Sequence, residues 1–148
     1  MVAASASGER TISAEDFFAA PDTHITQMTT LEPGEILKAV RIPAKWAGKR
    51  FYFEKVADRD VWDFALVSIA VAMSMEGDSI ADSRFVCGGV ACKPHRLTNV
   101  ESAARGKSLS DESADTVASI ASAGAEPLNY NHFKLPLMEN LVRRAMRG

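Results

Sequence analysis

Alternating residues over positions 66–75 form the clearest periodic pattern in the chain. Bulky apolar side chains occupy every second position from Val67 to Met75, and alanine or serine occupies the positions between them. Because successive side chains of a β-strand point to opposite faces, this pattern predicts a strand with a bulky apolar face and a small-residue face. We expect this strand to be covered on both sides.

The neighbouring segments predict an antiparallel sheet around this strand. Residues 76–79, Glu-Gly-Asp-Ser, are typical of a turn, and residues 80–87 read as the returning strand, so the two strands should form a hairpin. Residues 50–56 alternate aromatic and polar side chains, which indicates a strand with two different faces. Residues 36–42 follow a Pro-Gly turn and are a further predicted strand.

The C-terminal third of the chain changes from a period of two residues to a period of 3.6, which predicts three helices. The first spans about residues 98–106, where Thr98 and Glu101 have the spacing of a capping box. The second opens near Ser110, and the third runs from about Pro136. The order of elements predicts an α+β fold: an antiparallel sheet of three to four strands followed by three helices packed on one face.

The N-terminal residues carry a different signal. Residues 2–8 are rich in Ala, Ser and Gly and have too little apolar bulk for a packed core. We therefore expect residues 1–10 to be a flexible tail or the remnant of a missing domain, and residues 11–148 to be one domain. Ser13, followed three residues later by Asp16, predicts the start of a short helical turn.

Composition narrows the classes of partner. The chain has 148 residues, of which 47% are hydrophobic, and a formal net charge of -2. This charge gives no reason to expect nucleic acid or an anionic membrane as a partner. The longest apolar stretch, residues 64–75, is far shorter than the roughly 20 residues that span a bilayer. Residues 1–10 lack the basic and apolar regions of a secretory signal, so we expect a cytoplasmic protein.

Cysteine and histidine have limited potential as metal ligands. Cys87, Cys92 and His95 have C-x4-C-x2-H spacing, which supplies three ligands where a structural zinc site normally has four. A plant-type iron–sulfur motif needs two further cysteines. We expect free thiols and no metal site. Gly88-Gly89 has no phosphate-loop motif around it and by itself indicates a tight turn or a close backbone approach.

Four charged residues surround the entry to the apolar strand: Lys55, Arg59, Asp60 and Asp63. The interpretation that we favour from the residues alone is a structural ion pair. An exposed pair contributes only about 0–1 kcal/mol to stability, however, so a functional role is the alternative.

Short segments with recognisable sequences follow one another along nearly the whole chain. They are Arg10-Thr11-Ile12, Asp16-Phe17-Phe18, residues 31–37 (LEPGEIL), Val40-Arg41-Ile42-Pro43, Phe53 with Lys55 and Arg59, residues 63–68 (DFALVS), residues 88–91 (GGVA) with Pro94 and Arg96, and residues 141–145 (LVRRA). In this order they resemble the C-terminal domain of the FAD-binding subunit of molybdenum hydroxylases, the xanthine dehydrogenase and carbon monoxide dehydrogenase type.

The resemblance implies both a fold and a set of partners. The fold is a C-terminal α+β sandwich beside an N-terminal domain that holds the FAD phosphates in Gly-rich loops, and this chain has no such loops. The chain therefore looks truncated or split, with weak or absent FAD binding and no activity when alone. The implied partners are the FAD-binding N-terminal domain, an iron–sulfur subunit with [2Fe-2S] clusters and a molybdopterin subunit. Electrons would pass from molybdopterin through the clusters to FAD and then to an acceptor.

The resemblance also implies cofactor-binding residues, with no catalytic residue and no metal ligand in this chain. By position they are Lys55, Arg59 and Asp63 near the flavin ring, and Gly88, Gly89 and Arg96 in the turn beside it. A cation near the flavin N1 and C2 oxygen, from Lys55 or Arg59, would stabilise the negative charge of the reduced ring.

Two other functional classes stay open. The chain could be a non-catalytic module for dimerisation or docking, which would show a large exposed apolar patch. It could also be the non-functional fragment of a split gene. The substrate of the complex and its final electron acceptor are both open, because substrate contacts in the family belong to the molybdenum subunit.

Overall fold

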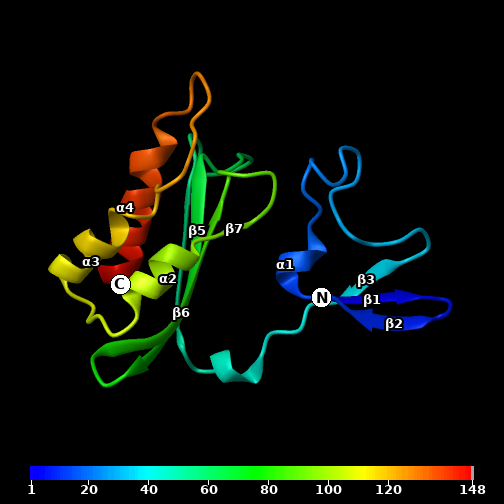
Figure 1. Cartoon of the computed structure of the whole chain (residues 1–148), viewed down its shortest axis with the longest axis horizontal. Coiled ribbons are helices and arrows are strands. Elements are labelled where there is room, and N and C mark those ends of the chain that lie inside the picture. Colours follow the sequence, from blue (N-terminus) through cyan, green and yellow to red (C-terminus); the bar gives the residue numbers. More distant parts are fainter. Residues whose placement is uncertain (148) are drawn as a thin grey trace. The chain divides into compact units, whose positions relative to one another are not determined.

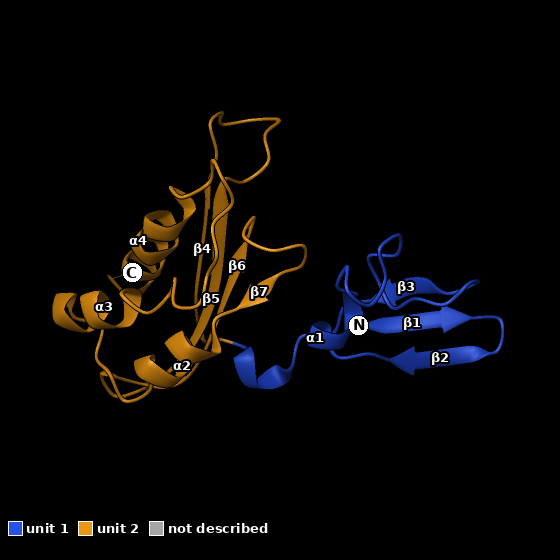
Figure 2. Cartoon of the chain, turned by 45° about the horizontal axis from the view of Figure 1, so that its top comes forward, with its two compact units in different colours: residues 1–47 blue, residues 48–148 orange. Residues whose placement is uncertain are grey.

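The computed structural model describes residues 1–147, and the chain forms two compact units that divide between Ala47 and Gly48 (Figure 2). The sequence predicted a division after residue 10 instead. The difference arises because residues 1–10 pair with a segment that lies more than 20 residues further along the chain.

Unit 1 contains a three-stranded antiparallel sheet in the order β2-β1-β3. Its elements are β1 (Val2–Ser5), β2 (Gly8–Thr11), the helix α1 (Ala14–Phe17), β3 (Ile36–Ala39) and the 3-10 helix η1 (Ala44–Trp46). The expectation of a flexible tail is therefore corrected, since residues 2–5 form the central strand. Small side chains suit this position, because Ala3 is fully buried in a cluster with Ile12 and Phe17. The remnant of a missing domain stays a prediction.

The element boundaries in unit 1 agree only in part with those predicted from the sequence. The Ser13 hydroxyl accepts a hydrogen bond from the Asp16 N–H, which confirms the predicted helix start. The strand predicted over residues 36–42 ends earlier, at Ala39. Arg10 forms a two-bond ion pair with Glu35, with distances of 2.7 and 2.8 Å, and this pairing lowers the pKa of Glu35 to about 2.

Unit 2 has a four-stranded antiparallel sheet in the order β4-β5-β6-β7, with three helices on one side (Figure 1). The strands are β4 (Arg50–Val56), β5 (Val67–Glu76), β6 (Ser79–Gly88) and β7 (His95–Arg96), and the helices are α2 (Thr98–Ala104), α3 (Asp111–Ala118) and α4 (Lys134–Arg147). The predicted α+β class, the β5–β6 hairpin and the three C-terminal helices are confirmed. Within residues 1–147, no helix combines the length and apolarity needed to cross a membrane.

The core of unit 2 lies between β5, β6 and the helices. Val67, Ile69, Val71 and Met73 of β5 are buried, as the alternating pattern predicted. They pack in one cluster with α4 residues, including Met138, Leu141, Val142, Ala145 and Met146. Each fully buried Val, Leu, Ile or Met side chain contributes about 1.5–3 kcal/mol of hydrophobic stabilisation.

The opposite face of the same sheet has no helix over it within unit 2. The β4 side chains Phe51 and Phe53 are 61% and 70% exposed and lie opposite Ala72 and Ala70 of β5. We call this surface, made by Phe51, Phe53, Ala70, Ala72 and Val86, the outer face. The sequence predicted that β5 is covered on both sides, and within unit 2 only the face toward the helices is covered. Alanine suits close packing and also exposure, so the sequence pattern did not distinguish the two.

Candidate cofactor-binding site

The loop from residue 57 to residue 66 joins β4 to β5 and brings together three of the predicted site residues. Lys55 Nζ donates to the Asp63 carbonyl oxygen at 2.8 Å. The Asp63 carboxylate accepts the Arg59 backbone N–H at 3.0 Å, and the Arg59 guanidinium donates to the Trp62 carbonyl at 2.8 Å. All three charged side chains therefore bond to backbone atoms of this loop, Lys55 from the end of β4 and the other two from the loop itself.

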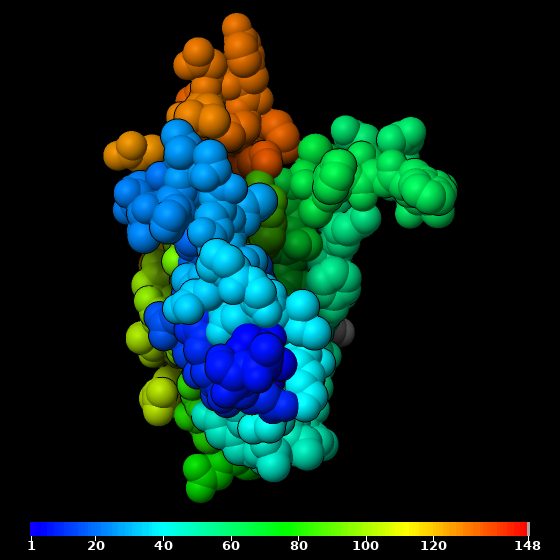
Figure 3. Space-filling view, turned by 90° about the vertical axis from the view of Figure 1, so that its right-hand side faces the viewer, coloured from blue at the N-terminus to red at the C-terminus, as the bar shows by residue number. Residues whose placement is uncertain are grey.

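Large apolar side chains stand on the outside of this loop. Val61 is 69% exposed, and Trp62 and Phe64 are each 94% exposed. Figure 3 shows the segment around residue 60 projecting from the surface of its unit. Trp62 is not among the site residues predicted from the sequence, although an aromatic residue set among charged residues in a loop is a signal for a binding surface. The loop offers flat rings and positive charge to a ligand.

Gly88 and Gly89 lie under the base of the loop, where little space is left for a side chain. Gly89 has a φ of +76°, and a Cβ there would lie 3.0 Å from the carbonyl oxygens of Ala65 and Leu66. A Cβ at Gly88 would lie 2.6 Å from Ser68 Oγ. Lys134 Nζ, from the start of α4, donates to the Gly89 carbonyl at 2.5 Å. The glycine pair therefore supports the loop by close backbone approach.

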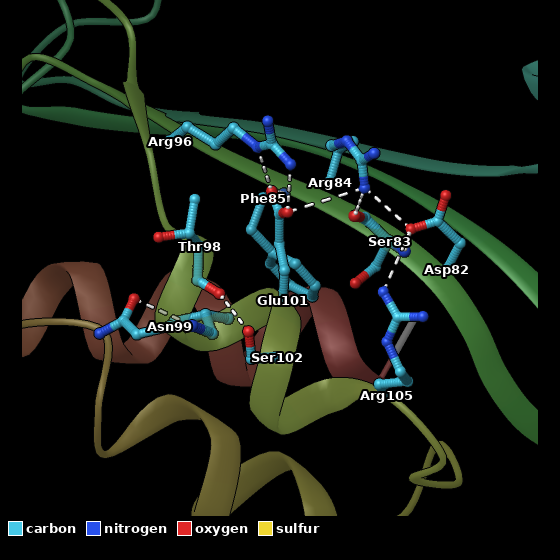
Figure 4. Close-up of polar contacts among 11 residues, drawn as sticks. Asp82, Ser83, Arg84, Phe85, Arg96, Thr98, Asn99, Glu101, Ser102 and Arg105 are labelled. Atoms are coloured by element: carbon cyan, nitrogen blue, oxygen red, sulfur yellow. Dashed lines mark hydrogen bonds and ion pairs between the residues drawn. The ribbon is translucent and has the colours of Figure 1, made fainter.

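Arg96 belongs to a different cluster (Figure 4). Its guanidinium makes a two-bond ion pair with the Glu101 carboxylate, at 2.8 and 2.7 Å. Glu101 also accepts the Phe85 backbone N–H at 3.2 Å, and Arg84 Nη1 lies 3.7 Å from its carboxylate. The side chain of Glu101 is only 9% exposed. This arrangement joins α2 to β6 and β7, so the structure gives Arg96 a structural partner and does not join it to the loop residues.

The role of Glu101 differs from the predicted capping box. The N-cap of α2 is Leu97 and has no side-chain hydrogen bond. β7 pairs with only two β6 residues, Val86 and Cys87, so the neighbouring Phe85 N–H needs another acceptor. Glu101 provides this acceptor. Its position three residues after Thr98 is a coincidence of spacing.

The residues of the C-x4-C-x2-H motif are in different environments. Cys87 is buried in the core, and its burial raises the pKa of the thiol to about 11. Cys92 is exposed in the β6–β7 connection. A protonated, buried Cys87 is a packing residue, which removes one ligand from the set that the spacing suggested.

A cavity of about 230 Å³ lies beside the glycine turn. Val90, His95, Gly124, Lys134 and Met138 are among the residues that line it. Its volume is below the range of about 300–1,000 Å³ that is typical of sites for cofactor-sized ligands. A whole flavin nucleotide therefore does not fit within it.

Comparison with known proteins identifies the family. The family model for the CO dehydrogenase flavoprotein C-terminal domain matches residues 52–148, which is almost all of unit 2. The chain belongs to this flavoprotein family. The sequence resembled the C-terminal domain of the FAD-binding subunit of molybdenum hydroxylases, and this resemblance is confirmed.

Relatives of this flavoprotein domain are subunits of oxidoreductases. The chain is 35% identical over 127 residues to the glyceraldehyde dehydrogenase medium chain of Sulfolobus acidocaldarius, covering 86% of this chain and 43% of the relative. It is 35% identical over 133 residues to PaoB, the FAD-binding subunit of aldehyde oxidoreductase from Escherichia coli, covering 90% and 38%. The chain thus spans less than half of these relatives.

Solved structures support the same assignment. Carbon monoxide dehydrogenase from Hydrogenophaga pseudoflava matches with a TM-score of 0.83 and 30% identity, over 98% of this chain and 50% of that one. Quinoline 2-oxidoreductase from Pseudomonas putida 86 matches with a TM-score of 0.80 and 29% identity, over 99% and 50%. The flavoprotein fold therefore extends through both units of the chain.

FAD is the cofactor that this family implies, and the residues of unit 2 fit one part of it. The loop and the end of β4 supply exposed rings and two cations, Arg59 and Lys55, which suit an aromatic ring that gains negative charge on reduction. No Gly-rich phosphate motif occurs in the sequence. The exposed rings and cations are thus the features of unit 2 that suit the flavin ring.

Proposed function

We propose that this chain is the part of a molybdenum hydroxylase flavoprotein subunit that covers the FAD ring and helps electrons pass from iron–sulfur clusters through FAD to an acceptor. The observation that carries the proposal is the β4–β5 loop of unit 2, where exposed rings lie beside cations in a domain of the flavoprotein family. FAD, when bound, supplies the redox chemistry by accepting and releasing electrons.

The proposed flavin surface contains five of the residues selected from the sequence. Lys55, Arg59 and Asp63 form the loop side, and Gly88 and Gly89 form its base. Their task is to orient one side of the ring and to exclude water from it. Arg96 is left out of this surface because its guanidinium forms the ion pair with Glu101.

The proposed complex has three further components. An FAD domain binds the phosphates, an iron–sulfur subunit carries [2Fe-2S] clusters, and a molybdopterin subunit oxidises the substrate. The support is that the relatives are medium chains or FAD-binding subunits about twice as long as this chain. The chain alone is therefore expected to be inactive. The identity of the substrate is expected to depend on the molybdopterin subunit.

Titration of FAD against the purified chain, followed by flavin fluorescence, tests this function. The titration is made with the chain alone and with a separately expressed FAD domain from a related subunit. We expect tighter binding in the mixture than with either part alone. If the chain alone bound FAD as tightly as the mixture, the proposal that the FAD domain supplies the phosphate contacts would be contradicted. If the mixture bound FAD no more tightly than its parts, the proposed function would be contradicted.

A docking module is a second candidate, because the outer face provides the apolar patch that this alternative requires. Phe51 and Phe53 are exposed on it, and Ala70 lies between Phe53 and Val86. Sedimentation of the purified chain distinguishes the candidates. A stable dimer that Phe53→Asp separates, together with no gain in FAD binding, would favour the docking module.

A further inference from the structure

Trp62 has a backbone conformation that bulky residues rarely adopt. Its φ is 56°, and it is the single non-glycine residue with positive φ among residues 1–147. This left-handed region is sterically unfavourable for a residue with a Cβ. Contacts around Trp62 must therefore stabilise this backbone conformation. Residues with such unfavourable φ values concentrate at functional sites.

The hydrogen bonds that hold this conformation all end on backbone atoms near Trp62. The Arg59 guanidinium bonds to the Trp62 carbonyl at 2.8 Å, and the Asp63 carboxylate fixes the Arg59 N–H at 3.0 Å. Lys55 binds the next carbonyl, that of Asp63, at 2.8 Å. The charged groups thus bond to the backbone of the turn, whereas the indole is 94% exposed.

We propose that Arg59 and Asp63 are positioning residues that hold the Trp62 backbone in its left-handed conformation, so that the exposed indole can serve as a flat surface for a planar aromatic ring. The inference rests on the proposed function, under which that ring is the flavin. A turn whose backbone is fixed before binding loses less conformational entropy on binding, and two flat rings gain from offset stacking. The sequence suggested instead that these charged residues contact the cofactor directly.

Binding measurements on four variants test the positioning role. In the mixture of chain and FAD domain, Trp62→Leu and Asp63→Ala should each weaken FAD binding about tenfold, the scale expected for one stacked ring. Asp63→Asn keeps an oxygen that can accept the Arg59 N–H, so it should stay within about twofold of the unmodified chain. Tyr130→Leu is the matched control, since Tyr130 is 93% exposed, and it should have no effect.

The double variant separates positioning from direct contact. If Asp63 acts only through Trp62, Trp62→Leu combined with Asp63→Ala should bind FAD no more weakly than Trp62→Leu alone. Additive losses would overturn the positioning role. Unchanged affinity of Trp62→Leu would overturn the indole as the binding surface.

A measurement without FAD tests whether Asp63 fixes the backbone turn that carries Trp62. The chain has two tryptophans, so 5-fluorotryptophan labelling gives two ¹⁹F signals, and Trp62→Leu identifies that of Trp62. Asp63→Ala should broaden this signal or move it toward that of free indole, and Asp63→Asn should not. The Trp46 signal should stay unchanged, because Trp46 is buried and lies in unit 1.

The two measurements fail independently. An unmoved Trp62 signal in Asp63→Ala would overturn the positioning role whatever the FAD titration gives. No FAD binding by the unmodified mixture would overturn the proposed function and the flavin as ligand, while the ¹⁹F result alone decides whether Asp63 holds the turn.

Discussion

Two charged clusters of unit 2 use the same residue types for different purposes. Around Glu101, a carboxylate with 9% side-chain exposure binds Arg96 and a strand N–H, and it fixes a helix to a sheet edge. Around Asp63, a half-buried carboxylate binds the backbone of its own exposed loop. Burial, more than charge, distinguishes them: the first cluster contributes to the stability of the whole unit, and the second determines the shape of one surface.

The largest expected effect is that of Glu101→Ala. It leaves Arg96 and the Phe85 N–H without their shared acceptor, and loss of one partner of a buried ion pair costs about 3 kcal/mol. Chemical denaturation measures the change in unfolding free energy. Glu101→Gln keeps one acceptor and should lose less. Equal, small losses in both variants would contradict the structural role of this cluster.

Gly89→Ala should have the next largest effect, because it should displace the base of the β4–β5 loop. The added Cβ would meet two carbonyl oxygens at 3.0 Å in a backbone conformation with φ of +76°. We expect a loss of about 2 kcal/mol in unfolding free energy. Gly124→Ala is the matched control, because its φ is +78° and a Cβ there has no neighbour within 4 Å. A smaller loss at Gly89 than at Gly124 would contradict the close approach.

Ser83→Ala should stabilise the region around the first cluster. Ser83 is 2% exposed, and its Oγ has no hydrogen-bond partner among the described residues. Removing a buried unsatisfied hydroxyl should raise the unfolding free energy by about 1 kcal/mol. Thermal denaturation checks the sign. A loss of stability would show that the hydroxyl has a partner.

Asp63→Ala should have the smallest effect on stability. Its carboxylate is part of an exposed loop, and substitutions of this kind usually change the unfolding free energy by less than about 0.5 kcal/mol. Limited proteolysis should nevertheless cut the loop faster in this variant than in Asp60→Ala. A stability loss comparable to that of Glu101→Ala would remove the distinction between the clusters.

The sequence predicted those parts of the fold that depend on neighbouring residues. The β5–β6 hairpin follows from alternation and a turn, and the starts of α1 and α3 follow from Ser13 and Ser110, whose hydroxyls accept helix N–H groups. Glu101 was misassigned because its main partners lie on β6 and β7, whereas its spacing from Thr98 imitates a local cap. Pairing between distant segments is not visible in local spacing.

The candidate site was predictable to a similar extent. The grouping of Lys55, Arg59 and Asp63 is confirmed as a geometric cluster, whereas their cofactor role stays a proposal. Trp62 was not selected, because a single exposed aromatic in a loop creates no periodic pattern. Its left-handed backbone depends on hydrogen bonds that only the folded loop brings together.

The outer face has a consequence for handling the protein. At one edge of the sheet, β7 covers only two β6 residues and Glu101 binds the next N–H, so little of this edge is open to another strand. At the other edge, β4 is seven residues long and carries Phe51 and Phe53. A long strand edge with apolar side chains favours intermolecular strand pairing and aggregation. Expression of the chain alone should therefore give protein that aggregates through this edge.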